Sequence, residues 1–469
     1  MKPGANGIGA LKSFELARAI QTGDISAAEA TETTIARIEY TDSQVNAFTG
    51  KRYARARKEA AAVDRLRAGG AILPALAGVP YAVKNLFDVA GEVTLAGSKI
   101  NREHAPAAQD AFLVEQMRAA GAVLVGALNM DEYAYGFTTE NSHYGPTRNP
   151  HDLQRTAGGS SGGCGAAVAA GQVGISLGSD TNGSIRVPAS LCGVWGLKPT
   201  FGRLSRRGSY PFVHSIDHLG PLADSLESLA LAYNALQGAD PLDPGCHATR
   251  VQPTGDWSQG MQGLRVGVLG GYFHDNASDP ARAVVATAAA ALGSGGTVEW
   301  PDAALARAAA FIITAAEGGS LHLADLRDRV EDFEPLSVDR FLAGALMPAS
   351  WVLQAQRFRR VYRDRVNALF QHWDVLLAPA TPVCATPIGA DWLNIQGTQH
   401  PARPSIGLLT QPISFAGCPV VAAPMWPVGT DGLPIAVQII AAPWREDLAL
   451  RAGYALQHAG LSHTRAVNL

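Results

Sequence analysis

Residues 157–171, AGGSSGGCGAAVAAG, are small residues only, and this segment constrains the fold more than any other. The apolar segment VGISLGS (173–179) follows directly and is predicted to form a buried strand. Glycine and alanine present almost no side chain, so other backbones can approach a helix built from them closely. The second half of 157–171 is therefore predicted to be a tightly packed helix, with serines near its N-terminus.

Helix-prone and strand-prone segments alternate along much of the chain, which is typical of α/β folds. Ser26 and Glu29 form a capping-box pattern at the start of one predicted helix. Strands are predicted at 76–89, 122–129, 173–179, 374–382, 419–427 and 433–442, and helices at 13–42, 51–70, 110–119 and 445–460. We expect an α/β/α fold with a large mixed sheet flanked by helices.

Residues 1–469 are predicted to form one domain, because strands from both ends of the chain complete one sheet. Its parts are a core at about 65–225, a mostly helical region at about 226–370, and C-terminal strands and a helix at about 371–469. A loop-like break interrupts the helical region at 236–262. We see no internal repeat of solenoid length.

The composition, with 47% hydrophobic and 17% charged residues and a net charge of −3, favours a large packed core. It gives no basis for binding nucleic acid or an anionic membrane. We expect neither a signal peptide nor a segment with the roughly 20 apolar residues of a spanning helix, and so a cytoplasmic protein. Five widely spaced cysteines without CxxC fit a reducing compartment. Without HExxH or a phosphate-binding loop, no metal or cofactor is predicted.

Lys84 interrupts the apolar, strand-prone segment LAGVPYAVKNLFDV (76–89). A lysine in such a segment extends its ammonium to solvent, pairs with an acid or loses its proton. If the amine is buried, desolvation lowers its pKa, and it can act as a base near neutral pH. Taken alone, the segment favours the first of these alternatives, a lysine whose ammonium reaches solvent.

The loop GGSSGG (158–163) matches G-x-S-x-G, the nucleophile elbow of α/β-hydrolases. That motif requires an apolar strand just before it, and the preceding NPHDLQRTA is no such strand. The elbow is therefore excluded. Because the loop leads straight into a small-residue helix, we expect an ordered loop whose serines lie near a helix N-terminus.

The stretch LGSDTNGSIRVP (177–188) leaves a predicted strand and turns through Asn182-Gly183. One interpretation is a plain hairpin tip. In the other, the successive N–H groups of Thr181, Asn182, Gly183 and Ser184 form a nest for a developing oxyanion. Ser184 is then the nucleophile, and the opposite charges of the flanking Asp180 and Arg186 brace the turn.

His214 and His218 have the i, i+4 spacing of a ligand pair on a helix. Their Gly- and Pro-rich surroundings favour a loop and ordinary histidines instead. A Ser-His-Asp triad stays open, because its members need not be adjacent in sequence.

Three segments in this order resemble the amidase signature family: the Lys84 strand, the GGSSGG loop and GSDTNGSIRVPASLCGVWGLKPT (178–200). The resemblance covers about residues 10–460 and is weakest in the variable region 226–370. It implies a Ser-cisSer-Lys triad in a serine hydrolase that cleaves C–N bonds. Ser184 would be the nucleophile, Ser160 the bridging serine beside a cis peptide, and Lys84 the base.

Two positions depart from the family pattern. The family usually has Gly-Gly before the nucleophile, where this chain has Asn182-Gly183. Asparagine tolerates unusual backbone better than most residues, so the nest can survive, and its side chain would crowd or hydrogen-bond a substrate. Cys164 replaces a serine common after the loop, and we interpret it as a buried packing residue.

Within the family, the run from 180 to 221 is similar to the 1-carboxybiuret hydrolases of cyanuric acid catabolism. This similarity implies a small ureido substrate that carries a carboxylate and loses ammonia, with no cofactor. It also implies a homo-oligomer and a small helical partner subunit.

Several residues are candidates for substrate binding. Tyr133, Tyr135 and Phe137 could wall a pocket, although such spacing is equally typical of core residues, and Ser161 lies beside the bridging serine. The candidates for binding the substrate carboxylate are Arg186, Arg357, Arg359, Arg360 and Arg403.

Other functions stay open from the sequence. One is the glutamine-hydrolysing component of an amidotransferase, which passes ammonia to a partner, and another is a general aliphatic or aryl amidase. A silent scaffold and a Ser-His-Asp esterase are further alternatives.

Overall fold

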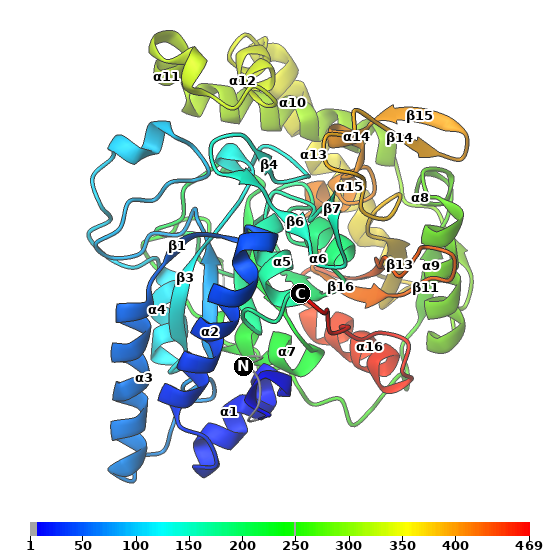
Figure 1. Cartoon of the computed structure of the whole chain (residues 1–469). Helices are drawn as coiled ribbons and strands as arrows, with labels where there is room; N and C mark the ends of the chain where they lie inside the picture. Colours follow the sequence, from blue (N-terminus) through cyan, green and yellow to red (C-terminus); the bar gives the residue numbers. More distant parts are fainter. Residues whose placement is uncertain (1–6, 248–249) are drawn as a thin grey trace.

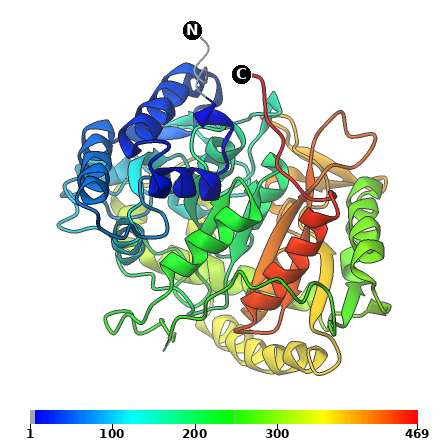
Figure 2. The ribbon, with the colours of Figure 1, turned by 90° about the horizontal axis from the view of Figure 1, so that it is seen from below.

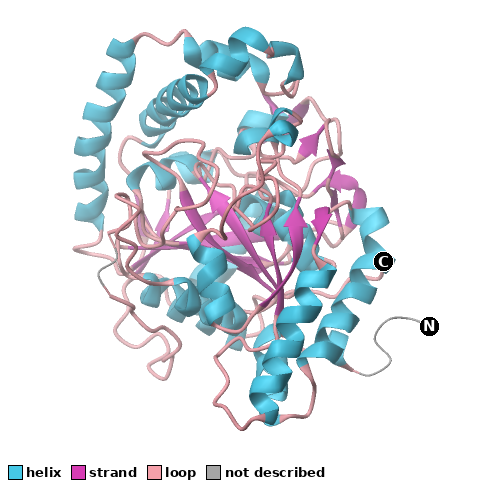
Figure 3. Cartoon of the chain, turned by 90° about the vertical axis from the view of Figure 1, so that its left-hand side faces the viewer, coloured by secondary structure: helices cyan, strands magenta, loops and turns pink. Residues whose placement is uncertain are grey.

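The computed structural model describes residues 7–247 and 250–469, in which helices cover both faces of one large sheet (Figures 1 and 3). Eleven strands form this sheet in the order β1-β3-β2-β8-β10-β9-β16-β17-β13-β11-β12. β2 pairs in parallel with both β3 and β8, and β11 pairs in parallel with both β13 and β12. The remaining neighbours are antiparallel. The predicted α/β fold with a mixed sheet is confirmed.

The strands of the large sheet are β1 (Phe48–Lys51), β2 (Pro80–Lys84), β3 (Val123–Leu128), β8 (Ile175–Asp180), β9 (Trp195–Lys198), β10 (His218–Ala223), β11 (Val266–Leu269), β12 (Thr297–Val298), β13 (Val375–Pro379), β16 (Val420–Met425) and β17 (Ile435–Ala441). Three small hairpins are formed by β4 (Glu140–Asn141) with β5 (Gly145–Pro146), β6 (Arg148–Asn149) with β7 (Asp152–Thr156), and β14 (Trp392–Ile395) with β15 (Thr398–Pro401).

The α-helices are α1 (Ser13–Thr22), α2 (Ala27–Val45), α3 (Tyr53–Ala68), α4 (Phe112–Ala119), α5 (Gly162–Ala169), α6 (Arg186–Cys192), α7 (Leu226–Leu236), α8 (Tyr272–Asp275), α9 (Asp279–Leu292), α10 (Ala303–Leu321), α11 (Leu323–Asp328), α12 (Val338–Ala345), α13 (Ala349–Leu369), α14 (Ala402–Ser405), α15 (Gln411–Ala416) and α16 (Glu446–His458). Short 3-10 turns are η1 (Ile8–Ala10), η2 (Ile100–Glu103), η3 (Glu132–Ala134) and η4 (Val330–Asp332). Helices α7 and α16 pack side by side on one face of the sheet, as Figure 2 shows.

Local sequence signals explain the elements around the centre. The predicted capping box opens α2, since Ser26 Oγ accepts from Glu29 N at 3.1 Å and Ser26 N donates to Glu29 Oε2 at 2.9 Å. The small residues of α5 are needed, because a Cβ on Gly163 would lie 2.6 Å from the backbone of Asn129. The tightly packed helix predicted in 157–171 is thus confirmed.

The parallel pairing of β2 with β8 decides where the chemistry can lie. Lys84 is the last residue of β2, and Asp180 is the last residue of β8. Parallel neighbours end at the same edge of a sheet, so Lys84 and the turn after Asp180 meet there.

Helices α10, α11 and α12 of the region 226–370 form a cap at the top of Figure 1, where α12 lies on α10. A Cβ on Gly344 would collide with Ala315 O, so the two helices touch backbone to backbone. This region also contributes β11 and β12 to the large sheet, which the sequence analysis did not predict. Strands of two to four residues carry too little alternation to be recognised.

One expectation is corrected by α10. Among the described residues, this helix alone is long and apolar enough to cross a membrane by length and composition. It packs against α12, α13 and α15. The face of α10 that meets these helices is buried, and this burial accounts for part of its apolarity.

Candidate active site

Lys84 is fully buried at the end of β2. Its Nζ donates to Ser160 Oγ at 2.7 Å and to Ser179 Oγ at 2.9 Å. Burial lowers the pKa of Lys84 from 10.5 to about 8. At pH 7, Lys84 is then neutral in about one protein molecule in ten, and in those molecules it can accept a proton.

Ser160 lies in the loop that leads into α5, and the Gly159–Ser160 peptide bond is cis. Its hydroxyl accepts the hydrogen bond from Lys84. Its carbonyl accepts from Asp131 N at 3.3 Å. The cis geometry that the family resemblance implied at this serine is therefore present.

Ser184 closes the turn after β8 and is held beside the Ser160 loop, because Ser161 N donates to its carbonyl at 3.3 Å. It lines a cavity together with Thr181 and Asn182. Its hydroxyl has no hydrogen-bond partner among residues 7–247 and 250–469, and it is free to meet a substrate. The structure thus brings Lys84 and Ser160 into direct contact and places Ser184 next to that pair.

The turn itself presents unused donors. In the described part of the chain, no acceptor takes the backbone N–H of Thr181, Asn182, Gly183 or Ser184. Gly183 has φ 140°, and a Cβ there would collide with Thr410 Oγ1. Backbone N–H groups that converge in a turn stabilise anionic oxygen, so this segment is a candidate for an oxyanion hole.

A buried ion pair braces this turn. Arg186 and Asp180 are both fully buried, and Arg186 Nε lies 3.0 Å from Asp180 Oδ2. The adjacent Arg186 guanidinium holds the pKa of Asp180 well below its usual range despite burial, and Asp180 also accepts from Ile185 N at 3.2 Å. Arg186 further donates to Gln438 Oε1 at 2.7 Å and to Thr410 O at 3.2 Å. The assignment of Arg186 to substrate binding is thus corrected, because its donors serve the turn.

The cavity beside Ser184 is lined by Ala134, Tyr135, Gly136, Phe137, Thr181, Asn182, Ser184, Phe212, Phe311, Thr314, Arg340 and Gln411. Tyr135 and Phe137 lie where the sequence analysis expected pocket walls. Tyr133 does not line the cavity. Its ring packs against His322, with 3.8 Å between the ring centroids, and its hydroxyl donates to Asn101 Oδ1 at 3.0 Å. The Ser161 hydroxyl is likewise turned away and donates to Ser179 O at 3.1 Å.

Arg340 is a cavity residue that sequence reasoning missed. It comes from α12, and its guanidinium lies 5.3 Å from the ring centre of Tyr135. Within the described ranges, this guanidinium has no hydrogen bond and no ion pair. Burial lowers the pKa of Arg340, which remains a cation at neutral pH. No motif surrounds it, so no sequence signal marked it.

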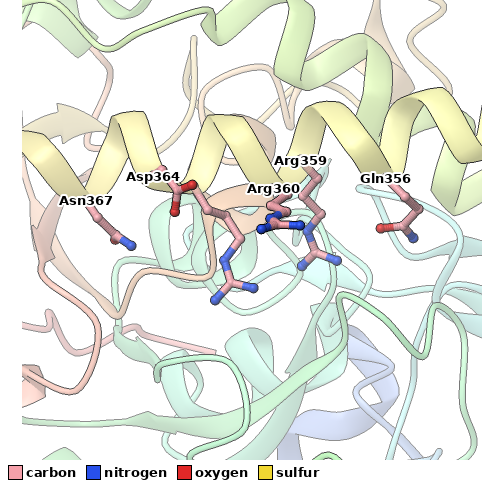
Figure 4. A pocket seen from close by; sticks show the side chains of 6 residues that line it. Gln356, Arg359, Arg360, Asp364 and Asn367 are labelled. Atoms are coloured by element: carbon pink, nitrogen blue, oxygen red, sulfur yellow. The ribbon is translucent and has the colours of Figure 1, made fainter.

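The other arginine candidates lie outside the set of residues that line the Ser184 cavity. Arg359 and Arg360 lie on α13 and line a separate pocket, which shares no lining residue with the Ser184 cavity (Figure 4). Arg359 donates to Ser215 O at 2.8 Å. Arg357 is exposed on the same helix. Arg403 donates to Asp131 Oδ1 at 3.4 Å and is not a lining residue of the Ser184 cavity.

Histidine chemistry finds no support near Ser184, since no histidine of the described chain lines its cavity. His218 lies in β10, where Nδ1 is 3.1 Å from Asp180 O and burial holds its pKa well below the usual range. His214 is exposed. The residues that the structure describes contain no cluster of three His, Cys, Asp or Glu side chains that could hold a metal ion.

Comparison with known proteins identifies the family. The family model described as Amidase matches residues 29–450. The chain belongs to the amidase family. It is accordingly an amidohydrolase that cleaves C–N bonds.

Relatives of this amidase cover nearly its whole length. It is 66% identical over 456 residues to AtzE, a component of the 1-carboxybiuret hydrolase of Pseudomonas sp. (strain ADP), covering 97% of this chain and 100% of that protein. It is 36% identical over 491 residues to the GatA-type component of the glutamyl-tRNA(Gln) amidotransferase of Moorella thermoacetica, covering 98% of each.

Solved structures agree with these sequence matches. An inhibitor-bound structure, described as a vestigial protein complex that reveals the origins of an s-triazine catabolic enzyme, has a TM-score of 0.97 and 66% identity. It covers 97% of this chain and 100% of its own. A 6-aminohexanoate cyclic dimer hydrolase has a TM-score of 0.84 and 30% identity, covering 96% of this chain and 97% of its own. The amidase therefore shares its fold with both of these proteins.

Proposed function

We propose that this amidase hydrolyses 1-carboxybiuret with release of ammonia, using Lys84, Ser160 and Ser184. The observation that carries the proposal is the 2.7 Å hydrogen bond from a buried lysine to the serine beside a free serine hydroxyl. The 66% identity to a component of a 1-carboxybiuret hydrolase supports the choice of substrate.

Proton transfer begins the proposed reaction. Neutral Lys84 takes the proton of Ser160, and Ser160 takes the proton of Ser184 as Ser184 Oγ attacks the carbonyl carbon. A serine hydroxyl is a weak nucleophile until a base removes its proton, so the lowered pKa of Lys84 is essential here.

The turn from Thr181 to Ser184 then holds the negative oxygen of the tetrahedral intermediate. Removing one oxyanion donor typically costs about 2.7–4 kcal/mol of transition-state stabilisation. The proton returns by the same route to the leaving nitrogen, and ammonia departs. Water, deprotonated through Ser160 and Lys84, clears the acyl group from Ser184.

Arg340 is the proposed partner of the substrate carboxylate. A carboxylate that enters a cavity needs a cation beside it. The guanidinium of Arg340 has no ion pair and no hydrogen bond within the described chain, so it can pair with the substrate. Tyr135 and Phe137 form apolar walls around the planar substrate. This arrangement suits a small, planar, anionic ureide.

The resemblance further supports a homo-oligomer, a cytoplasmic location and a small helical partner subunit. One similar protein is described as a subunit, while a similar structure is described as a protein complex. We propose the same kind of assembly here.

The test is ammonia release from a panel of carboxybiuret, biuret, allophanate, glutamine and simple aliphatic amides. Wild type is compared with Lys84→Ala and Ser184→Ala. Turnover centred on carboxybiuret and lost in both variants is expected. A preference for glutamine would point to the amidotransferase type, and a preference for simple amides to a general amidase. Full activity of Lys84→Ala would overturn the mechanism.

A further inference from the structure

Asn182 carries an amide whose two ends have different surroundings. Nδ2 donates to Thr314 Oγ1 at 3.0 Å. Oδ1 is buried and has no hydrogen-bond partner in the described part of the chain. The residue is 7% exposed and lines the cavity beside Ser184. A buried acceptor without a donor is unfavourable, and a ligand that donates to it relieves that penalty.

The position of this amide is set before any substrate binds. The backbone oxygen of Asn182 accepts from Thr410 Oγ1 at 2.6 Å, which holds the main chain. Thr314, on α10, holds the side-chain nitrogen. With both restraints in place, Oδ1 is a preorganised acceptor, and little entropy is lost when a donor meets it.

The other amide of the cavity has its acceptor engaged. Gln411 Oε1 accepts from Arg307 Nε at 2.9 Å. Asn182 Oδ1 is thus the side-chain amide oxygen of the cavity that remains available to a substrate N–H.

Ureides and carboxamides differ at one place that matters here. Both have a nitrogen on the leaving side of the scissile carbonyl, but only a ureide has an N–H on the side that stays with the acyl group. The oxyanion turn takes the carbonyl oxygen, Ser184 takes the carbon, and the proton relay serves the leaving nitrogen. The retained N–H is the substrate donor that these groups leave without an acceptor.

We propose that Asn182 Oδ1 accepts a hydrogen bond from the retained N–H and thereby selects ureides over carboxamides. The inference rests on the proposed function of the same cavity and adds the group that recognises its substrate class. Asn182 acts as a specificity residue through its side chain, in addition to the backbone N–H that it contributes to the turn. A site with a buried polar group discriminates strongly against an analogue that lacks the matching one.

The experiment compares carboxybiuret with its methylene isostere, in which CH2 replaces the retained N–H. Both compounds carry the same charge and leaving group, and their difference in intrinsic reactivity is the same for every enzyme, so the change in the ratio of their kcat/KM values between wild type and variant isolates one hydrogen bond. The enzymes are wild type, Asn182→Gly, Asn182→Asp and the pair Thr314→Val and Thr314→Ser. Asn182→Gly keeps the backbone donor and removes the acceptor, and Asn182→Asp keeps an acceptor oxygen.

Wild type is expected to prefer the ureide about ten- to a hundredfold. Asn182→Gly should reduce that ratio to within about threefold of unity, whereas Asn182→Asp should retain most of it. Thr314→Val should lower the ureide-to-isostere ratio, because the Asn182 side chain loses its hydrogen-bond partner. Thr314→Ser keeps that hydroxyl and should keep the wild-type ratio. A ratio that stays at the wild-type value in Asn182→Gly would overturn the role of Asn182 and leave the proposed function intact. Equal kcat/KM values of wild type for the two compounds would likewise overturn the role of Asn182, whereas a wild type that releases no ammonia from carboxybiuret would overturn the proposed function.

Discussion

Lys84 Nζ lies 2.7 Å from Ser160 Oγ, and both groups are fully buried. The lysine meets no carboxylate at hydrogen-bonding distance in the described chain; its two partners are serine hydroxyls. An ammonium in such surroundings is poorly solvated, which is why its pKa falls to about 8. Since this pKa lies close to neutral pH, part of the Lys84 population is neutral there and can accept a proton.

The activity should follow this ionisation. Because only neutral Lys84 accepts a proton, kcat/KM is expected to rise about tenfold per pH unit below pH 8 and to level off above it. Stopped assays of ammonia release between pH 5.5 and 9.5 measure the profile. A plateau that begins near pH 6.5 would indicate a histidine base and contradict the assignment.

The same burial makes Lys84 a stability cost. The pKa of Lys84 is lower in the folded than in the unfolded protein, so the unfolded state binds more protons between about pH 8 and 10.5. Burial of the Lys84 ammonium therefore lowers the free energy of unfolding at neutral pH. This penalty disappears as the pH rises from about 8 to 10.5. Lys84→Met is expected to stabilise the fold at pH 7 by about 1–3 kcal/mol while lowering kcat at least about 10³-fold. Urea unfolding at pH 7 and pH 10 tests this, since the difference between variant and wild type should shrink at the higher pH.

Arg340 should affect binding of carboxylated substrates only. Loss of a charge-assisted hydrogen bond costs about 1.5–3 kcal/mol, so Arg340→Gln is expected to raise KM for carboxybiuret by about ten- to a hundredfold. Biuret, which has no carboxylate, should show little change. Arg360→Gln, on α13 in a separate pocket, is the matched control and should behave as wild type. Equal effects of Arg340→Gln on both substrates would argue for a purely structural role.

The buried pair of Asp180 and Arg186 should be costly to break. Asp180→Asn leaves a buried guanidinium without its counter-charge, and the free energy of unfolding is expected to fall by about 3–5 kcal/mol. Asp374→Asn breaks a more exposed pair with Arg265 and should cost less than about 1 kcal/mol. Denaturant titrations of both variants give the comparison. Similar losses for the two variants would show that Asp180 does not hold the turn.

The sequence identifies the candidate catalytic residues by their motifs but says little about the side chains that surround them. Lys84, Ser160 and Ser184 stand in motifs, and the free N–H groups around Gly183 follow from the Asn-Gly turn. Arg340 could not be found, because its place depends on how α12 lies on α10, a tertiary relationship with no local signature. Tyr133 and Tyr135 are two positions apart, yet one packs on His322 and the other faces the cavity. Tyr133 has positive φ, 48°, in an irregular turn, where no helix or strand period predicts the direction of a side chain.

The backbone contact between Gly344 and Ala315 joins α10 and α12 into one unit that carries Thr314 and Arg340. The proposed catalytic residues follow strands at one edge of the sheet, whereas two of the proposed recognition groups belong to this unit. If these roles hold, we expect substitutions in α10 and α12 to change which substrates are bound while the proposed reaction stays the same. Gly344 is required at this contact, since any larger residue there would push the two helices apart and displace Thr314 and Arg340 relative to each other.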